Sequence, residues 1–417
     1  MFPKNGQKNP EIRFDGFTDD WEQRKFSDYY KMSSGYAFKM SDYCEDGIGL
    51  INGESIQHGI INDDNLNHLP ESFIEQYPDF ILKEGDIVVG LNRPITNGNL
   101  KIARIPSKYN DSLLYQRAGK VVYKEECDRD FSYVLLSQEI LKHTLVEAVG
   151  SDQPFISTSK LDKWQMMIPK DIEEQHKIGE YFSNLDNLIT LHQRKCDEMK
   201  KMKKFMLQKM FPKNGQKNPE IRFDGFTDDW EQRKLGEVVE KVTTKNNDTQ
   251  YIETFTNSAE LGIMSQREYF DHDVSNIENI SGYYIVENDA FVYNPRISTS
   301  APVGPINRNK LGRTGVMSPL YTVFKVNGID SEYLEWYFKS TGWHSFMKFN
   351  GDSGARSDRF SIKDSVFFEM PIPTPDIDEQ EKIGEYFSSL DHLITLHQRK
   401  VENLKNLKKY MLQNMFV

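Results

Sequence analysis

Apolar residues recur along two long stretches of the chain with the spacing of a coiled coil. From Ile178 to Met210 they return at alternating steps of four and three residues, and the same spacing runs from Ile383 to Met415. This pattern is sustained over about five heptads without a proline, and it predicts two coiled-coil helices. Helices of about 35–40 residues would form rods roughly 50–60 Å long, because an α-helix rises 1.5 Å per residue.

Polar residues interrupt both apolar seams at matching places. His192 and Lys203 stand in the first seam, and His397 and Lys408 stand in the second. A polar residue at a seam position commonly fixes the register of a coiled coil. We therefore interpret these four residues as register-setting, since nothing else in the sequence supports a functional histidine.

Two variable segments, about 27–170 and 236–375, have a mixed α/β pattern. Each contains one expected amphipathic helix, at 131–145 and 330–349, followed by a loop that contains glycine. The expected strands lie at 81–91, 118–126 and 164–170 in the first segment and at 285–298, 318–326 and 366–375 in the second. The order of elements matches although the residues differ, which predicts one fold used twice.

The sequences that frame the variable segments are repeated. Phe2–Lys25 returns without a change as Phe211–Lys234, and the block from Ile172 returns in similar form from Ile377. The second helix ends in the Met-Phe pair with which the chain begins, so the order is circular. Two rods that join the same two bodies in opposite senses should pack antiparallel. Otherwise about ten seam side chains on each rod would stay in water, and each would lose roughly 1.5–3 kcal/mol of the free energy that burial provides.

These patterns predict an α+β protein with two pseudo-two-fold related mixed α/β domains, separated by a pair of long antiparallel coiled-coil helices. The expected boundaries are a constant segment at 1–25, a variable domain at 26–170, a helix at 171–211, the repeated constant segment at 212–234, a variable domain at 235–375 and a helix at 376–417. The repeat has two interpretations, which both remain open. It either caps each rod end, through Trp21/Trp230 and Phe17/Phe226, or reflects recombination that exchanges variable domains.

Composition narrows the class of protein. A chain of 417 residues that is 38% hydrophobic can bury more than one core. It has no apolar run long enough to span a membrane and no signal-peptide pattern at its start. Its three cysteines have no metal-ligand spacing, which indicates reduced thiols in a cytoplasmic protein. The net charge of −11 argues against a free-standing polyanion binder, although a charge sum can hide basic faces.

Catalytic motifs are missing from the sequence. It has no glycine-rich nucleotide loop, no nucleophile elbow and no HExxH. Asn294-Pro295 is followed by Arg-Ile, whereas the amino-methyltransferase motif needs Pro and an aromatic residue there. Glu198-Met199-Lys200 has the letters of a nuclease motif but lies on a predicted rod. We therefore expect no catalytic residue, no metal and no cofactor in this chain itself.

Basic and amide side chains gather on the loops of both variable segments. Arginine reads guanine through a bidentate contact and asparagine reads adenine, while lysine and serine position phosphates. The matched placement of these residues in both halves favours DNA binding. The candidates are Asn92, Arg93, Asn97, Lys101, Arg104, Tyr293, Asn294, Arg296, Ser298, Arg308, Arg313, Arg356 and Arg359.

In this arrangement the chain resembles the specificity subunit of a Type I restriction–modification enzyme. The resemblance rests on Pro169, Glu174-Gln175, Ile178 and Leu185-Asp186, and on Pro373, Glu379-Gln380, Ile383 and Leu390-Asp391, which are similar to the entry into the family's conserved helix. It implies two target recognition domains that bind double-stranded DNA. It also implies two methyltransferase subunits, which bring S-adenosylmethionine, and restriction–translocation subunits that use ATP.

The expected function is therefore that of a non-catalytic subunit that recognises DNA sequence. It would read an asymmetric bipartite target with one domain per half-site and would scaffold the methyltransferase and restriction subunits. Methionine packs adaptably, so we expect the helix ends to dock partner subunits through Met199, Met202, Met206, Met210, Leu404, Leu407, Met411 and Met415. The alternatives are a coiled-coil adaptor with two protein-binding domains and an unrecognised DNA-modifying enzyme.

Overall fold

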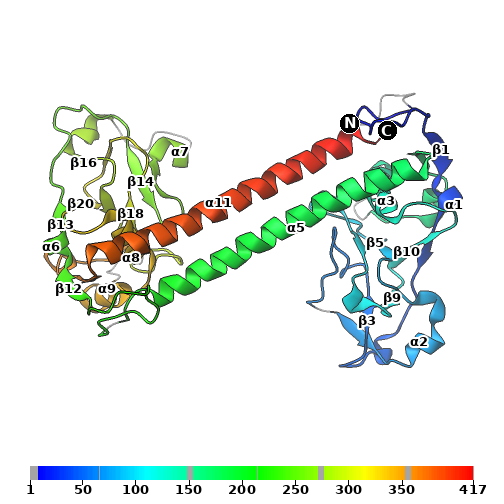
Figure 1. The fold of residues 1–417 in the computed structure, drawn as a ribbon, viewed down its shortest axis with the longest axis horizontal. Coiled ribbons are helices and arrows are strands. Elements are labelled where there is room, and N and C mark those ends of the chain that lie inside the picture. The colour runs from blue at the N-terminus through cyan, green and yellow to red at the C-terminus, as the bar shows by residue number, and fades with distance from the viewer. Residues whose placement is uncertain are drawn as a thin grey trace. The chain divides into compact units, whose positions relative to one another are not determined.

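The computed structural model describes residues 8–64, 66–147, 154–213, 215–270, 277–352 and 358–416 (Figure 1). The chain forms two compact units. Unit 1 consists of Met1–Leu191 together with Lys400–Val417, and unit 2 consists of His192–Arg399. The C-terminal stretch thus belongs to the same unit as the N-terminal stretch, as the circular order of the repeats predicts.

Unit 1 is built around a four-stranded antiparallel sheet with the order β2-β10-β5-β8. Smaller sheets have the orders β1-β11, β4-β3-β9 and β6-β7. The bounds are β1 (Glu22–Lys25), α1 (Phe26–Tyr29), β2 (Tyr30–Ser34), β3 (Ile48–Ile51), β4 (Asn67–Leu69), α2 (Phe73–Gln76), β5 (Ile87–Gly90), β6 (Ile95–Thr96), β7 (Asn99–Leu100), β8 (Ile102–Arg104), β9 (Leu113–Leu114), β10 (Ala118–Tyr123), α3 (Arg129–Glu147), α4 (Thr158–Leu161) and β11 (Gln165–Ile168).

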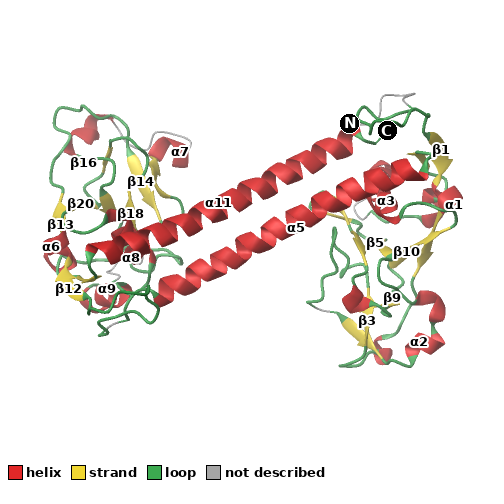
Figure 2. Cartoon of the chain, viewed as in Figure 1, coloured by secondary structure: helices red, strands yellow, loops and turns green. Residues whose placement is uncertain are grey.

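Unit 2 repeats this plan with a four-stranded sheet of order β13-β20-β17-β18 and two-stranded sheets β12-β21, β14-β15 and β16-β19. Figure 2 distinguishes the helices and strands of both units by colour. The bounds are β12 (Glu231–Lys234), α6 (Leu235–Val238), β13 (Val239–Lys241), β14 (Phe255–Ser258), β15 (Gly262–Ser265), α7 (Gln266–Phe270), β16 (Tyr284–Val286), β17 (Phe291–Tyr293), β18 (Ile306–Arg308), β19 (Gly315–Met317), β20 (Thr322–Val326), α8 (Ser331–Lys339), α9 (His344–Asn350), α10 (Asp364–Phe367) and β21 (Pro371–Thr374). The prediction of one mixed α/β fold used twice is confirmed.

The predicted single helix at 330–349 is wrong, because two helices, α8 and α9, occupy this stretch. The indole Nε1 of Trp343 donates to the carbonyls of Phe338 and Ser340, both at 3.1 Å. The hydroxyl of Ser340 donates to the carbonyl of Tyr337 at 2.6 Å. These bonds satisfy carbonyls that the end of a helix leaves unpaired, so α8 stops there.

The two predicted rods are the helices α5 (Ile172–Lys209) and α11 (Ile377–Asn414), each of 38 residues. In unit 1, Lys408 on α11 donates to both carboxylate oxygens of Asp186 on α5, at 2.6 and 2.8 Å. Nearer the start of α5, Phe182 packs against Phe416, with ring centroids 5.9 Å apart. Residue numbers rise along one helix as they fall along the other, so the helices pack antiparallel in this unit.

The same sense of pairing holds in unit 2. The Nδ1 atoms of His192 and His397 lie 2.9 Å apart, and Lys203 pairs with Asp391 at 2.5 Å. The polar seam residues therefore contact partners on the opposite helix, as residues that set the register would. Of the helices in the described ranges, none is both long and apolar enough to cross a membrane.

One glycine in each long helix marks the place where the variable domain packs against it. A Cβ on Gly179 would lie 2.4 Å from the backbone nitrogen of Phe131, at the start of α3. A Cβ on Gly384 would lie 2.8 Å from the Cβ of Glu332, at the start of α8. Only glycine permits such a close approach, so both helices carry it despite its lower helix propensity.

A buried glutamate near the start of α5 holds the repeated constant segment in unit 1. Glu174 accepts hydrogen bonds from Arg13 Nε at 2.6 Å, from Arg13 Nη2 at 2.8 Å and from the indole of Trp21 at 3.2 Å. Such a charge-assisted bidentate pair is among the stronger polar contacts in proteins. We call this arrangement the glutamate lock.

Unit 2 contains the same glutamate lock on α11. Glu379 is fully buried and accepts from Arg222 at 2.7 and 2.8 Å and from the indole of Trp230 at 2.9 Å. The arginine and the tryptophan both come from the second copy of the 24-residue repeat. In both units, an arginine and a tryptophan of the repeat therefore fasten the constant segment to a long helix.

The glutamine that follows each glutamate joins the constant helix to the variable domain. Gln175 donates to the carbonyl of Pro169 at 2.9 Å, and its Oε1 accepts from the backbone nitrogen of Asp128 at 3.1 Å. Gln380 accepts in the same way from the backbone nitrogen of Asp330 at 2.8 Å. In each Glu-Gln pair, the glutamate thus binds the constant segment and the glutamine binds the variable domain.

The C-terminal stretch completes unit 1 as an internal junction completes unit 2. The backbone nitrogen of Ile12 donates to the carbonyl of Asn414 at 2.9 Å, and Ile221 donates to the carbonyl of Lys209 at 3.0 Å. The corresponding Phe416 and Phe211 are buried in the main apolar clusters of their units. The junction is therefore the same in both units.

Candidate nucleic-acid interface

In unit 1, the loop after β5 lies beside the segment that precedes α4. Asn92 forms a β-bridge with Phe155, and Arg93 donates its backbone N–H to the carbonyl of Pro154 at 3.1 Å. The backbone nitrogen of Ile156 donates to the carbonyl of Leu91 at 2.8 Å. These contacts place two loops from distant parts of the sequence next to each other.

Unit 2 builds the same pair of loops from different residues. Arg296 and Arg359 form a β-bridge, and Ile297 donates its backbone N–H to the carbonyl of Asp358 at 3.0 Å. Phe360 donates to the carbonyl of Pro295 at 2.7 Å, which corresponds to the bond between Ile156 and Leu91 in unit 1. We call these two arrangements the paired loops.

Several predicted DNA contacts point to solvent on the paired loops. Arg93 and Arg296 are exposed, and within the described ranges neither side chain pairs with an acid. Arg93 also has a φ of +46°, which a residue other than glycine or asparagine seldom adopts. Strained backbone of this kind tends to occur at functional sites, so strain and exposure together favour Arg93 as a ligand contact, and exposure favours Arg296.

The paired loops carry further predicted contacts of both chemical kinds. Asn97 is exposed at a turn, with a φ of +50°, and Ser298 is exposed on the loop that contains Arg296. Asn92 and Arg359 are half-buried at the bridges themselves. Arg356 lies outside the described residues. The structure thus brings together Asn92 and Arg93 in one unit, and Arg296 and Arg359 in the other.

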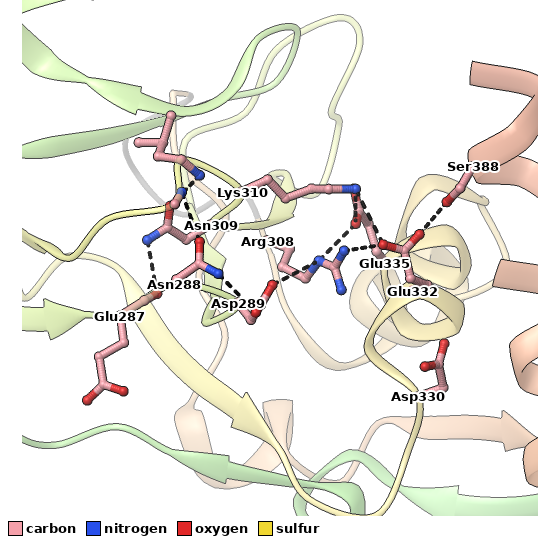
Figure 3. Close-up of polar contacts among 12 residues, drawn as sticks. Glu287, Asn288, Asp289, Arg308, Asn309, Lys310, Asp330, Glu332, Glu335 and Ser388 are labelled. Carbon is pink, nitrogen blue, oxygen red and sulfur yellow. Dashed lines mark hydrogen bonds and ion pairs between the residues drawn. The ribbon is translucent and has the colours of Figure 1, made fainter. Parts of the chain in front are cut away.

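Arg308 does not lie on a free surface, because acids surround its guanidinium (Figure 3). The residue is 8% exposed, and its Nη2 lies 2.5 Å from Glu332. Its Nε lies 3.1 Å from Glu335 and 3.9 Å from Asp289. Ser388 on α11 donates to Glu332 from the other side. Arg308 therefore joins β18 to α8 and, through Glu332, to the long helix, and it is not available to DNA.

Arg104 occupies the corresponding position in unit 1 and has the corresponding role. It faces Ile87 in the sheet register, as Arg308 faces Phe291. Its Nη1 pairs with Asp130 at the start of α3 at 2.5 Å, and its guanidinium lies 4.6 Å from the ring centroid of Tyr133. The matched placement of these two arginines reflects a shared contact between sheet and helix.

Three more predicted contacts support the loops from inside. Tyr293 is buried, and its hydroxyl donates to the carbonyl of Val303 at 2.9 Å. Burial also raises the pKa of this phenol. Asn294 donates to the carbonyl of Asn257 at 2.7 Å. The ammonium of Lys101 donates to the carbonyl of Gly53 at 3.3 Å.

Arg313 is exposed but already paired. Its Nε and Nη2 both donate to the carboxylate of Glu253 at 2.8 Å. This fork geometry uses the same donors that would read a guanine. The pair raises the pKa of Arg313, chiefly through the hydrogen bonds to Glu253.

Sequence reasoning missed an exposed aromatic residue on the paired loops of unit 1. Phe155 is 66% exposed and lies at the bridge to Asn92. Apolar side chains at such a place contact the thymine methyl group or insert between base steps. No sequence pattern marks Phe155, because its exposure depends on a bridge between distant segments.

The predicted partner-docking residues on the long helices fall into two groups. Met210, Leu404 and Met415 are buried in the apolar clusters of their own units, and Met206 and Met411 pack against those clusters. Met199 is half-buried. Only Met202 and Leu407 are exposed, at corresponding positions in the two helices. The buried residues close the cores and leave little surface for another protein.

A second apolar stripe, separate from the seam, is exposed on the long helices within each unit. In unit 1 it comprises Leu188 and Leu191 on α5 and Leu407 and Tyr410 on α11, and in unit 2 it comprises Leu393 and Leu396 on α11 and Met202 and Phe205 on α5. Each residue on α5 has its counterpart on α11 at the equivalent position of the repeat. An exposed apolar stripe with polar surroundings is typical of a surface that another protein covers.

Comparison with known proteins identifies the family to which this architecture belongs. Residues 18–201 and 227–406 match the family described as the Type I restriction modification DNA specificity domain. The chain is 35% identical over 188 residues to the Type I restriction enzyme MjaVIII specificity subunit of Methanocaldococcus jannaschii, a match that covers 45% of this chain and 44% of that relative. It is 30% identical over 184 residues to the Type I restriction enzyme EcoAI specificity subunit of Escherichia coli, which covers 44% and 30% of the two chains.

These two matches span less than half of each relative's length. The crystal structure of the Type I restriction–modification system S subunit from M. genitalium is similar along 98% of this chain and 99% of that one, with a TM-score of 0.59 and 14% identity. At this identity the likeness concerns the fold. Since the two matched segments together take in most of its length, the chain belongs to the Type I restriction modification DNA specificity family and contains the family's domain twice.

Proposed function

We propose that this chain is the subunit of a Type I restriction–modification complex that recognises DNA sequence and itself catalyses no reaction. The observation that carries the proposal is the recurrence of the paired loops, at the same place in two units, with an exposed arginine on each, Arg93 in unit 1 and Arg296 in unit 2. Arginine supplies base-specific and phosphate contacts in DNA complexes. One unit would therefore read each half of the target.

The two units present different side chains, so the two half-sites should differ. Unit 1 offers Asn92, Arg93 and Phe155, whereas unit 2 offers Arg296 and Arg359. Asparagine favours adenine and arginine favours guanine. An asymmetric, bipartite target follows, with an unread spacer between half-sites about 10 bp apart from centre to centre.

The second apolar stripe favours two partner subunits of one kind. It occurs once in each unit with residues at equivalent positions, and equivalent surfaces bind equivalent partners. We propose two methyltransferase subunits there, which would bring S-adenosylmethionine, with restriction–translocation subunits joining the complex and using ATP. A cytoplasmic location agrees with three cysteines that are all free thiols.

Single-molecule methylation sequencing of a host that carries the complex tests this proposal. With the chain present, we expect a methylated motif made of two different half-sites and an unread spacer, and without it we expect no such motif. A continuous or palindromic motif would contradict one reader per half-site. Unchanged methylation in the absence of the chain would instead favour a protein-binding adaptor.

Single substitutions on the paired loops should act on one half-site each. We expect Arg296→Ala to relax selection at the half-site read by unit 2, and Arg93→Ala at the other, each by roughly 1–3 kcal/mol if the arginine contacts a base edge. Arg313→Ala is a matched control, because it removes a charge from unit 2 outside the paired loops. Equal loss at both half-sites would mean that these arginines hold phosphates.

A further inference from the structure

A buried asparagine in unit 2 lies behind the loop that carries Arg296. Asn257, at the end of β14, is 2% exposed and cannot reach a ligand itself. Its side-chain Nδ2 donates to the carbonyl of Val292 at 2.7 Å, and its backbone carbonyl accepts from the side-chain amide of Asn294 at 2.7 Å. Both partners lie where the chain enters the loop.

The same asparagine is bonded where the chain leaves the loop. Its Nδ2 also lies 3.4 Å from the carbonyl of Pro305, and its Oδ1 accepts from the Nδ2 of Asn307 at 2.6 Å. Asn307 is buried as well and donates a second bond to the carbonyl of Ser258 at 3.1 Å. One residue therefore ties together both ends of the loop 294–305.

The bonds of Asn294 extend this support to the exposed arginine. While its amide donates to Asn257, its Oδ1 accepts from the backbone nitrogen of Arg296 at 3.0 Å. Asn294 thus links the backbone of Arg296 to the backbone of Asn257, and the side-chain bonds of Asn257 in turn hold that backbone against both loop ends. A base contact needs its donors held to a fraction of an ångström, so a shift at Asn257 would change what Arg296 can read.

Unit 1 has a simpler arrangement at the corresponding place. There the carbonyl of Gly53 accepts from the ammonium of Lys101, and a Cβ on Gly90 would lie 3.3 Å from that same carbonyl. Gly90 occupies the position of Asn294 in the sheet, and glycine at 53 has no side chain to bond to the loop ends. The support through a buried side chain is therefore specific to the reader in unit 2.

We propose that Asn257 is a positioning residue for sequence selection by unit 2: it fixes both ends of the loop 294–305 and thereby determines which base Arg296 reads, without touching DNA. The inference rests on the proposed function. It differs from a purely structural role, because an asparagine that only satisfied buried carbonyls would affect folding and leave selectivity unchanged.

The test uses the full-length chain in its host, with methylation read at cognate sites and at sites that differ by one base. In Asn257→Leu, we expect methylation at sites altered in the unit 2 half-site to rise at least about tenfold relative to cognate sites. Selection at the other half-site should not change. Arg296→Ala identifies which half-site belongs to unit 2.

Asn309→Leu is the matched control. Asn309 is an equally buried asparagine in the same unit, and its amide donates to the carbonyls of Glu287 and Arg313 at 2.9 and 3.0 Å, away from the loop. We expect it to lower total methylation through lost stability without changing the ratio between sites. If Asn257→Leu behaves like Asn309→Leu, the inference is wrong.

A second variant covers the case in which Asn257→Leu fails to fold. Asn257→Ser keeps a small polar group at this buried place and leaves Asn307 with its bond from Lys339 intact. A serine hydroxyl is too short to reach Val292, Pro305 and Asn307 together, so this variant should fold and still show relaxed selection at the unit 2 half-site. Full selectivity in Asn257→Ser would overturn the inference. A wild-type chain that directs no bipartite methylation would instead refute the proposed function.

Discussion

Replacing Glu379 by alanine should lower the free energy of unfolding of unit 2 by about 3–5 kcal/mol, because removal of one partner of a buried ion pair leaves the other uncompensated. Glu379 is fully buried and accepts three hydrogen bonds. Without it, the mostly buried guanidinium of Arg222 and the indole of Trp230 lose their acceptor. Denaturant unfolding of the full chain measures the change.

Two comparisons make this result interpretable. Glu174→Ala should act on unit 1 to a similar extent, since the glutamate lock there has the same three donors. Glu381→Ala removes an exposed carboxylate two residues along α11 and should change stability by less than about 0.5 kcal/mol. Equal losses in Glu379→Ala and Glu381→Ala would show that the lock contributes little.

Lengthening the paired helices by one heptad should lengthen the unread spacer of the DNA target by about three base pairs. A heptad adds about 10 Å to a helix and keeps the apolar seam in phase. We place the insertion near Lys204 in α5, with a matching insertion near Asp391 in α11, because Lys203 and Asp391 are paired in the structure. Both half-site sequences should stay the same, and methylation sequencing reads the new spacer.

A four-residue insertion at the same places is the control, since it keeps the seam in phase only approximately. It should assemble less well than the heptad variant. If the heptad variant folds and assembles but methylates the original spacing, the helices do not set the distance between half-sites. An insertion in α5 alone should disturb the pair, because the seam residues beyond it lose their partners on α11.

Repetition in the sequence predicted the fold, because identical side chains form the same contacts in both units. Lys203 and Lys408 were expected to set register, and each pairs with an aspartate on the opposite helix. The shared element order of the variable segments likewise predicted one fold used twice, and their main sheets have the same strand order. The break between α8 and α9 could not be foreseen, since it depends on the indole of Trp343 folding back onto helix carbonyls.

The candidate site was predicted only in part, because a sequence shows which side chains are basic but not which acids face them. Arg104 and Arg308 recur in both halves and resemble a repeated DNA contact. In the structure they recur because each lies at the end of an equivalent strand, β8 or β18, and pairs with an acid on the equivalent helix, α3 or α8. Arg93 and Arg296 have the same chemistry but lie on the paired loops, and the bridges that form these loops join segments about 60 residues apart.

The glutamate lock also bears on how half of this protein would behave. Each lock takes its arginine and tryptophan from one copy of the repeated segment and its glutamate from the long helix that follows it. One repeated segment, one variable domain and one helix therefore form a complete structural set. Crossing-over between the repeated segments would delete one such set and leave the other intact. The seam of the remaining helix would then be uncovered, and a second identical chain could cover it. Such a homodimer would present the same reader twice, and its DNA target would become a palindrome.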